Sequence, residues 1–165
     1  MSLQKRPKLI AFDLDYTLWP FYVGVEMMGP FSEDANGKIV NGDNEIVQPF
    51  EDVPQILETL HEDQYTLAVA SRALRSDLAT DLLRLFKWNR YFTCVEIYEA
   101  KKTTHLQRIK EITNVEYSDM LLFDDEQRNK DDVKEIGVQT VKVTEGVTHG
   151  LVYQGLKEYA ENSGV

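Results

Sequence analysis

Short apolar runs separated by helical patterns constrain the fold of this chain more than any other feature. Five runs of four or five residues, several of them rich in β-branched, aromatic and aliphatic side chains, occupy positions 9–12, 66–70, 95–98, 120–123 and 139–143. Runs of this length predict strands, and uniformly apolar runs predict strands that are buried on both faces of a sheet. We therefore expect a sheet of five short strands.

Helical periodicity fills the intervals between these runs. Asp52 or Glu51, together with Pro54, opens a segment whose apolar side chains share one helical face, namely Val53, Ile56, Leu57 and Leu60. Four further helical patterns occupy positions 74–86, 102–113, 128–136 and 148–161. Strands that alternate with helices predict an α/β fold of three layers, in which helices cover both faces of a mostly parallel five-stranded sheet. We find no repeat or linker, and we expect residues 1–165 to form a single domain.

The segment 19–50 does not fit this alternation, because it is longer than the usual connection of a few residues. Asn36-Gly37 and Asn41-Gly42 favour tight turns within it. We expect a β-hairpin in which 38–40 pairs with 45–47, and we expect the insertion to act as a small flap at the functional site.

Composition excludes several classes of function. The chain has 18 Lys and Arg against 28 Asp and Glu, a formal net charge of −10, which disfavours binding to nucleic acids or anionic membranes. No apolar run approaches the ~20 residues that span a bilayer. The N-terminal residues lack the apolar stretch of a secretory signal. Cys94 is the only cysteine, so no disulfide can form within the chain and a reducing, cytoplasmic location is expected.

Chemically active side chains follow four of the predicted strands. In a parallel sheet, ligands bind beyond the carboxyl ends of the strands, so these side chains should meet at one edge. The residues concerned are Asp13 and Asp15, Ser71 and Arg72, Lys101 and Lys102, and Asp124 and Asp125.

The types of these residues favour phosphate chemistry with a metal ion. Residues two apart on an extended chain point to the same side, so Asp13 and Asp15 can face one substrate. A hard cation such as Mg²⁺ offsets the repulsion between neighbouring carboxylates. A lysine in the first turn of a helix opposes the helix dipole, which indicates that Lys101 or Lys102 binds an anion. The Ser71 hydroxyl can hold a phosphoryl oxygen or cap a helix.

Four blocks of sequence resemble a known family. They are FDLDYTLWP at 12–20, ASR at 70–72, KTTH at 102–105 and FDDEQRN at 123–129. In order and spacing they resemble the four motifs of the haloacid dehalogenase (HAD) superfamily, and more closely its magnesium-dependent phosphatase subfamily. The resemblance covers nearly the whole chain. It implies a Rossmann-like fold, and the insertion of about 30 residues is too small for the large cap domain that some relatives carry.

The resemblance also implies catalytic roles. Asp13 would be the nucleophile that forms an aspartyl-phosphate, and Asp15 would protonate the leaving oxygen and then activate water. Mg²⁺ would be held by the Asp13 carboxylate, the Asp15 backbone carbonyl and Asp125. Asp124 would lie beside the ion without binding it directly, and Thr17 would support the turn after the first strand.

The phosphoryl oxygens would be held by Ser71, Arg72 and Lys102. Lys101 is the rival for the lysine position, and Lys102 is preferred because Thr-Thr-His follows it. Many relatives carry a second acid at the position of Asn129, so we expect no metal contact from this residue. Cys94 and His105 are expected to have structural roles.

Several functions remain to be distinguished. Dehalogenases lack the second aspartate of the first motif, so Asp15 favours phosphoryl transfer, and the absence of a large cap favours water over a sugar as the acceptor. The resemblance implies phosphate monoesters as substrates, including aryl phosphates, phosphotyrosine side chains, sugar phosphates and phosphorylated glycation adducts. A phospho-receiver signalling module is the alternative, since it also groups aspartates, a hydroxyl and a lysine around Mg²⁺.

Aromatic residues are frequent in and near the insertion. They could stack on an aryl phosphate, or they could form a small core of the insertion itself. The residues concerned are Trp19, Phe21, Tyr22, Phe31 and Phe50.

Overall fold

The computed structural model describes residues 5–163 and contains the predicted α/β architecture. Its main sheet has five parallel strands in the order β5-β4-β1-β6-β7. The strands are β1 (Leu9–Phe12), β4 (Thr66–Ser71), β5 (Phe92–Ile97), β6 (Met120–Asp124) and β7 (Gln139–Lys142). The helices are α1 (Val53–Glu62), α2 (Ser76–Leu85), α3 (Lys102–Thr113), α4 (Gln127–Lys134) and α5 (His149–Ser163), and a 3₁₀ turn spans Tyr117–Asp119.

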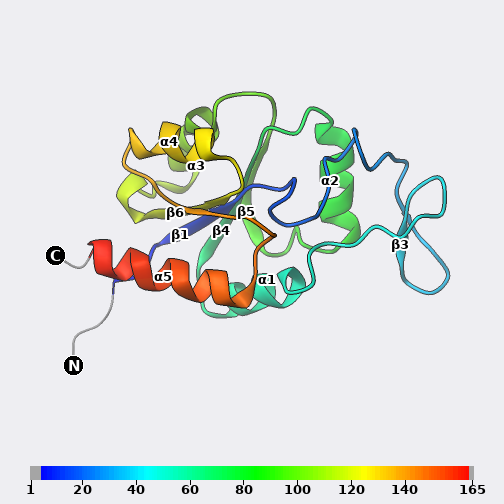
Figure 1. Ribbon diagram of the computed structural model, residues 1–165, viewed down its shortest axis with the longest axis horizontal. Helices are drawn as coiled ribbons and strands as arrows, with labels where there is room; N and C mark the ends of the chain where they lie inside the picture. The colour runs from blue at the N-terminus through cyan, green and yellow to red at the C-terminus, as the bar shows by residue number, and fades with distance from the viewer. Residues whose placement is uncertain (1–4, 164–165) are drawn as a thin grey trace.

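The helices form a layer on each face of the sheet (Figure 1). Successive side chains of β1 point to opposite faces, so Ile10 and Phe12 pack with α1, α2 and α5, whereas Leu9 and Ala11 pack with α3 and α4. All four side chains of β1 are fully buried. The three-layer, Rossmann-like fold without a large cap domain is therefore confirmed.

Most predicted boundaries agree with the structure to within about two residues, but β5 differs. It begins at Phe92, whereas the apolar run predicted a strand from position 95. Phe92 and Cys94 are buried and Thr93 and Val95 are exposed, as is usual for an edge strand. Such alternation leaves no continuous apolar run, and for this reason the start of the strand was missed.

The insertion contains a small antiparallel hairpin, but its pairing differs from the prediction. Strand β3 (Ile39–Val40) pairs with β2 (Ser32–Glu33) through the turn that contains Gly37. The predicted partner 45–47 contributes only a single bridge, from Ile46 to Val40. Gly37 has a φ of +79°, which the turn between β2 and β3 requires and which glycine adopts without strain.

Two residues that were expected to be structural are buried away from solvent. The His105 ring is fully buried, and its nitrogens lie 3.1 Å from the carbonyl oxygen of Lys101 and 2.8 Å from that of Tyr98. Cys94 is a free thiol that is 5% exposed. Within residues 5–163, no helix combines the length and the apolar character that crossing a bilayer requires.

Candidate active site

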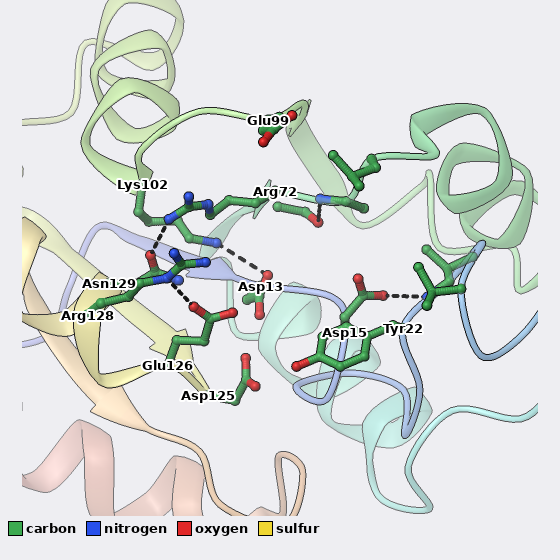
Figure 2. A pocket seen from close by; sticks show the side chains of 15 residues that line it. Asp13, Asp15, Tyr22, Arg72, Glu99, Lys102, Asp125, Glu126, Arg128 and Asn129 are labelled. Atoms are coloured by element: carbon green, nitrogen blue, oxygen red, sulfur yellow. Dashed lines mark hydrogen bonds and ion pairs between the residues drawn. The ribbon is translucent and has the colours of Figure 1, made fainter.

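Four segments that are distant in sequence meet at the carboxyl edge of the sheet. Asp13 follows β1, Ser71 ends β4, Asp124 ends β6, and Lys102 begins α3. Because β4, β1 and β6 are parallel neighbours, their carboxyl ends lie side by side. Figure 2 shows the Asp13 and Lys102 side chains from two of these segments facing one pocket, together with Asp15, Arg72 and Asp125.

Lys102 lies at the centre of this arrangement and is completely buried. Its Nζ lies 3.2 Å from Asp13 Oδ1 and 3.0 Å from Asp124 Oδ2, and it donates a hydrogen bond of 2.6 Å to the carbonyl oxygen of Ala70. Burial disfavours the charged ammonium, but the two carboxylates outweigh burial and raise the pKa of Lys102 above its usual value. Lys101 is exposed, and its side chain forms no ion pair with the described residues.

Asp13 is held from two sides. The Thr17 hydroxyl donates a hydrogen bond of 3.3 Å to Asp13 Oδ2, and Lys102 contacts the other carboxylate oxygen. The side chain is largely buried, and this burial raises the pKa of Asp13 to about 7. Lys102 lowers this pKa and the neighbouring Asp125 raises it, so a nearby cation would be needed to keep Asp13 fully ionised.

Three carboxylates form a compact cluster that fits a hard cation. Asp13, Asp124 and Asp125 each offer an oxygen atom, and these atoms all lie within 4.8 Å of one another. Asp124 already accepts contacts from Lys102, from the backbone N–H of Glu126 and from a buried amide described below. Asp13 and the half-buried Asp125 are therefore the better placed of the three to bind a cation directly.

One carboxylate oxygen of Asp15 accepts hydrogen bonds from the protein, and the other is available to a ligand. Its Oδ1 accepts hydrogen bonds from the Trp19 indole (2.8 Å) and from the backbone N–H of Val23 (3.1 Å). Burial raises the pKa of Asp15 to about 6, although both hydrogen bonds oppose the increase. Asp15 lines the pocket beside Asp13, as Figure 2 shows.

Ser71 and Arg72 line the same pocket. The Ser71 Oγ accepts a hydrogen bond of 3.1 Å from the backbone N–H of Ala73, and α2 begins only at Ser76, so Ser71 caps no helix. Arg72 donates a hydrogen bond of 3.3 Å from Nη1 to Asn129 Oδ1. Asn129 in turn donates to both oxygens of Asp124 at 3.1 and 3.2 Å, a role that its sequence position alone did not indicate.

The pocket is a cavity of about 250 Å³ with an apolar lip. Tyr22, Val25 and Leu74 line it and are 43%, 66% and 68% exposed, respectively. Val25 and Leu74 belong to no motif and were not predicted as site residues. Glu99, Glu126 and Arg128, for which no role in the site was predicted, line the pocket as well.

The insertion contributes to the pocket through its first part only. Tyr22, Val23 and Val25 line the pocket, whereas β2 and β3 contribute no lining residue. The part of the insertion that reaches the pocket is therefore the short loop around Tyr22, whereas strand β3 of the hairpin lies beyond α2, away from the sheet (Figure 1). That the insertion acts as a flap stays a prediction.

Most of the aromatic residues in and near the insertion pack in a core, and one of them is placed to contact a substrate. Trp19, Phe21 and Phe31 are buried in the main core, and Phe50 packs against it. Tyr22 is the one member of the group that lines the pocket.

Comparison with known proteins identifies the family. The acid phosphatase family profile matches residues 5–162. The chain belongs to the acid phosphatase family. It is 37% identical to human magnesium-dependent phosphatase 1 over 96% of this chain and 90% of that protein. It is 32% identical to a HAD-like hydrolase superfamily protein from Schizosaccharomyces pombe, over 80% of this chain and 83% of that protein.

The fold of this acid phosphatase family member occurs in solved structures of the HAD superfamily. A HAD-superfamily hydrolase from Ehrlichia chaffeensis superimposes with a TM-score of 0.66 at 14% identity, over 95% of this chain and 98% of that one. The resemblance to the HAD superfamily, and to its magnesium-dependent phosphatases in particular, is thus confirmed.

Proposed function

We propose that this protein is a magnesium-dependent phosphatase that hydrolyses phosphate monoesters through an aspartyl-phosphate intermediate. The observation that carries the proposal is the setting of Asp13, which contacts Lys102 and Thr17 and lies beside Asp125 in an open pocket. A second acid, Asp15, lines the same pocket and has a free carboxylate oxygen. This combination suits nucleophilic attack followed by acid–base catalysis.

In the first step, a carboxylate oxygen of Asp13 attacks the phosphorus atom and the ester P–O bond breaks. The leaving oxygen takes a proton from Asp15. In the second step, Asp15 accepts a proton from a water molecule that attacks the phosphorus of the aspartyl-phosphate. The acyl P–O bond then breaks, which releases inorganic phosphate and restores the Asp13 carboxylate.

The residues around Asp13 neutralise the charge of the phosphoryl group. Lys102 and the Ser71 hydroxyl would hold phosphoryl oxygens, and Thr17 orients the nucleophile. Asp13, Asp125 and the backbone carbonyl of Asp15 would hold Mg²⁺, with Asp124 behind them. The bound ion supplies positive charge that offsets both the carboxylates and the phosphoryl oxygens.

The shape of the pocket favours small or protruding substrates. Its volume of about 250 Å³ lies below the ~300–1,000 Å³ of typical ligand cavities. The exposed side chains of Tyr22, Val25 and Leu74 would contact an apolar leaving group at the mouth. We therefore propose aryl phosphates and phosphotyrosine side chains as substrates, with sugar phosphates and phosphorylated glycation adducts as further candidates, and a cytoplasmic location.

The test is a phosphatase screen of the purified protein with Mg²⁺ and with EDTA. The substrates are p-nitrophenyl phosphate, a phosphotyrosine peptide and a set of sugar phosphates. We expect continuous phosphate release that requires Mg²⁺, that disappears in Asp13→Asn and that falls by about 10²–10⁴-fold in Asp15→Asn. A protein that is phosphorylated once and then turns over slowly would instead support the phospho-receiver alternative, and full activity of Asp13→Asn would exclude Asp13 as the nucleophile.

A further inference from the structure

The cations that line the pocket differ in how their charge is balanced. Lys102 contacts Asp13 and Asp124, and Arg128 contacts Glu126 at 2.5 Å. Arg72 is the third cation that lines the pocket. Among the described residues it forms no ion pair with a carboxylate, not even with Glu99, which lines the same pocket. Its hydrogen-bonding partner is the neutral amide of Asn129. The charge of Arg72 is therefore available to a ligand.

Asn129 fixes the position of this guanidinium. It is 1% exposed, and its Nδ2 donates to both oxygens of Asp124, an arrangement that leaves its Oδ1 to accept from Arg72 Nη1. In Figure 2 the Arg72 side chain extends across the pocket towards Asn129. Because a guanidinium has five N–H donors and one of them is used here, the others remain free for a second partner.

The side chain at position 129 decides whether Arg72 keeps its charge for a ligand. An aspartate there would form an ion pair with Arg72 and neutralise it. The amide holds the guanidinium in place without cancelling its charge, as a specific anion-binding position requires.

We propose that Arg72, positioned by Asn129, binds a second anionic group on the substrate, and that the preferred phosphate monoesters carry a carboxylate on the leaving group. This inference rests on the proposed phosphatase function and assigns Arg72 to the leaving group in place of the transferring phosphoryl group. Asp13, Asp15, Asp125, Glu126 and Glu99 give the pocket a negative character, so an additional carboxylate needs a cation of its own.

The test compares 3-carboxyphenyl phosphate with 3-carbamoylphenyl phosphate, two esters of similar shape that differ in charge. The measured quantity is the ratio of their kcat/KM values in the presence of Mg²⁺. In the wild-type protein we expect the carboxylate ester to be preferred by at least about fivefold, as a charge-assisted hydrogen bond at a partly solvated site provides. In Arg72→Leu this preference should disappear, chiefly through a higher KM for the carboxylate ester.

Three further variants separate a charge effect from a structural one. Arg72→Lys should restore part of the preference, because it keeps the charge without the planar fork. Asn129→Asp should reduce the preference although Arg72 is still present. Arg128→Leu is the matched control, since it removes an arginine that is already paired within the same pocket, and it should leave the ratio unchanged.

Equal losses on both esters in Arg72→Leu would show that Arg72 binds the transferring phosphoryl group and would overturn the inference. The same holds if wild-type protein hydrolyses both esters with no preference. If the wild-type protein hydrolyses neither ester, nor p-nitrophenyl phosphate, then the proposed phosphatase function itself is wrong. Because each ratio is taken within one variant, a partial loss of folded protein does not alter it.

Discussion

At the scale of single residues, the two adjacent lysines show that a shift of one position along the chain decides which side chain enters the site. The dipole argument predicted that a lysine at the start of the helix binds an anion, but it did not separate Lys101 from Lys102 by geometry. Helix α3 begins at Lys102 and Lys101 is its extended N-cap residue, so the two side chains leave the backbone in different directions. Lys102 is fully buried against Asp13 and Asp124, whereas Lys101 is exposed.

This difference predicts opposite outcomes for one substitution at two positions. Lys102→Met removes the ammonium from two buried carboxylates, and we expect it to abolish phosphatase activity and to reduce the free energy of unfolding by about 3–5 kcal/mol. Lys101→Met should retain near-normal activity and stability. Urea denaturation and phosphate release measure both effects, and loss of activity in the Lys101 variant alone would assign the site lysine to position 101.

At the scale of secondary structure, local patterns predicted the elements well wherever burial was uniform. The apolar runs of β1 and β6 are buried along their whole length and were located correctly. Edge strand β5 and the hairpin strands were predicted less well, because their pairing depends on neighbours that the local sequence does not reveal. Strand β3 has candidate partners on both sides, and the turn at Gly37 selected the preceding one.

Helix α5 contains two glycines that should respond in opposite ways to alanine. A Cβ atom on Gly155 would lie 2.6 Å from Val141 Cγ2 and 3.2 Å from Phe123 Cζ, so Gly155→Ala should overpack the interface with β6 and β7. We expect it to cost about 1–3 kcal/mol, in spite of the ~1 kcal/mol by which alanine is favoured over glycine within helices.

Gly150 is the matched control in the same helix. A Cβ atom there would meet nothing nearer than the Thr148 hydroxyl at 4.0 Å, so Gly150→Ala should stabilise the protein by roughly 0.5–1 kcal/mol. Urea denaturation of the two variants gives the comparison. If both variants are stabilised, then α5 does not pack against β7 as closely as the structure shows.

The environment of β5 predicts the reactivity of Cys94. Burial, together with the nearby Glu96, raises the pKa of the Cys94 thiol to about 11. At pH 8 only about one thiol in a thousand would be ionised, and the thiolate is the reactive form. Iodoacetamide should therefore modify the native protein at least ~100-fold more slowly than the urea-unfolded protein, and the native rate should rise as the pH approaches 11. Equal rates in the two states would contradict the burial of this side chain.

At the scale of the whole molecule, the fold concentrates negative charge at one edge of the sheet. Asp13 comes from the end of β1, and Asp124 and Asp125 come from the end of β6 and the loop after it. The fold thus brings an oxygen atom of each of these three carboxylates within 4.8 Å of the others, and the Lys102 ammonium contacts only Asp13 and Asp124. This grouping of negative charge is unfavourable until a further cation binds. Stability and function therefore compete at this edge.

This competition predicts how metal removal and mutation combine. Mg²⁺ should raise the melting temperature of the wild-type protein relative to EDTA by several degrees, because ligands that bind only the folded state stabilise it. In EDTA, Asp13→Asn should melt at a higher temperature than the wild-type protein, since one of the three carboxylates is gone. Its stabilisation by Mg²⁺ should be smaller.

Asp77→Asn provides the control for this experiment. Asp77 is an exposed acid paired with Arg75 at 2.9 Å, outside the pocket. Its substitution should leave the stabilisation by Mg²⁺ at the wild-type value. An equal Mg²⁺ effect in Asp13→Asn and in the wild-type protein would show that Asp13 does not bind the ion.

The alternation of strands and helices, and the acids that follow the strands, could be predicted from the order of the amino acids alone. These features follow from periodicity and from the direction of parallel strands, both of which are local or general rules. That residues 1–165 form a single domain stays a prediction. The folded structure was needed to learn which lysine is buried, which apolar side chains form the lip, and that Arg72 contacts Asn129. Such contacts depend on side-chain directions across 57 residues of chain, and no local pattern encodes them.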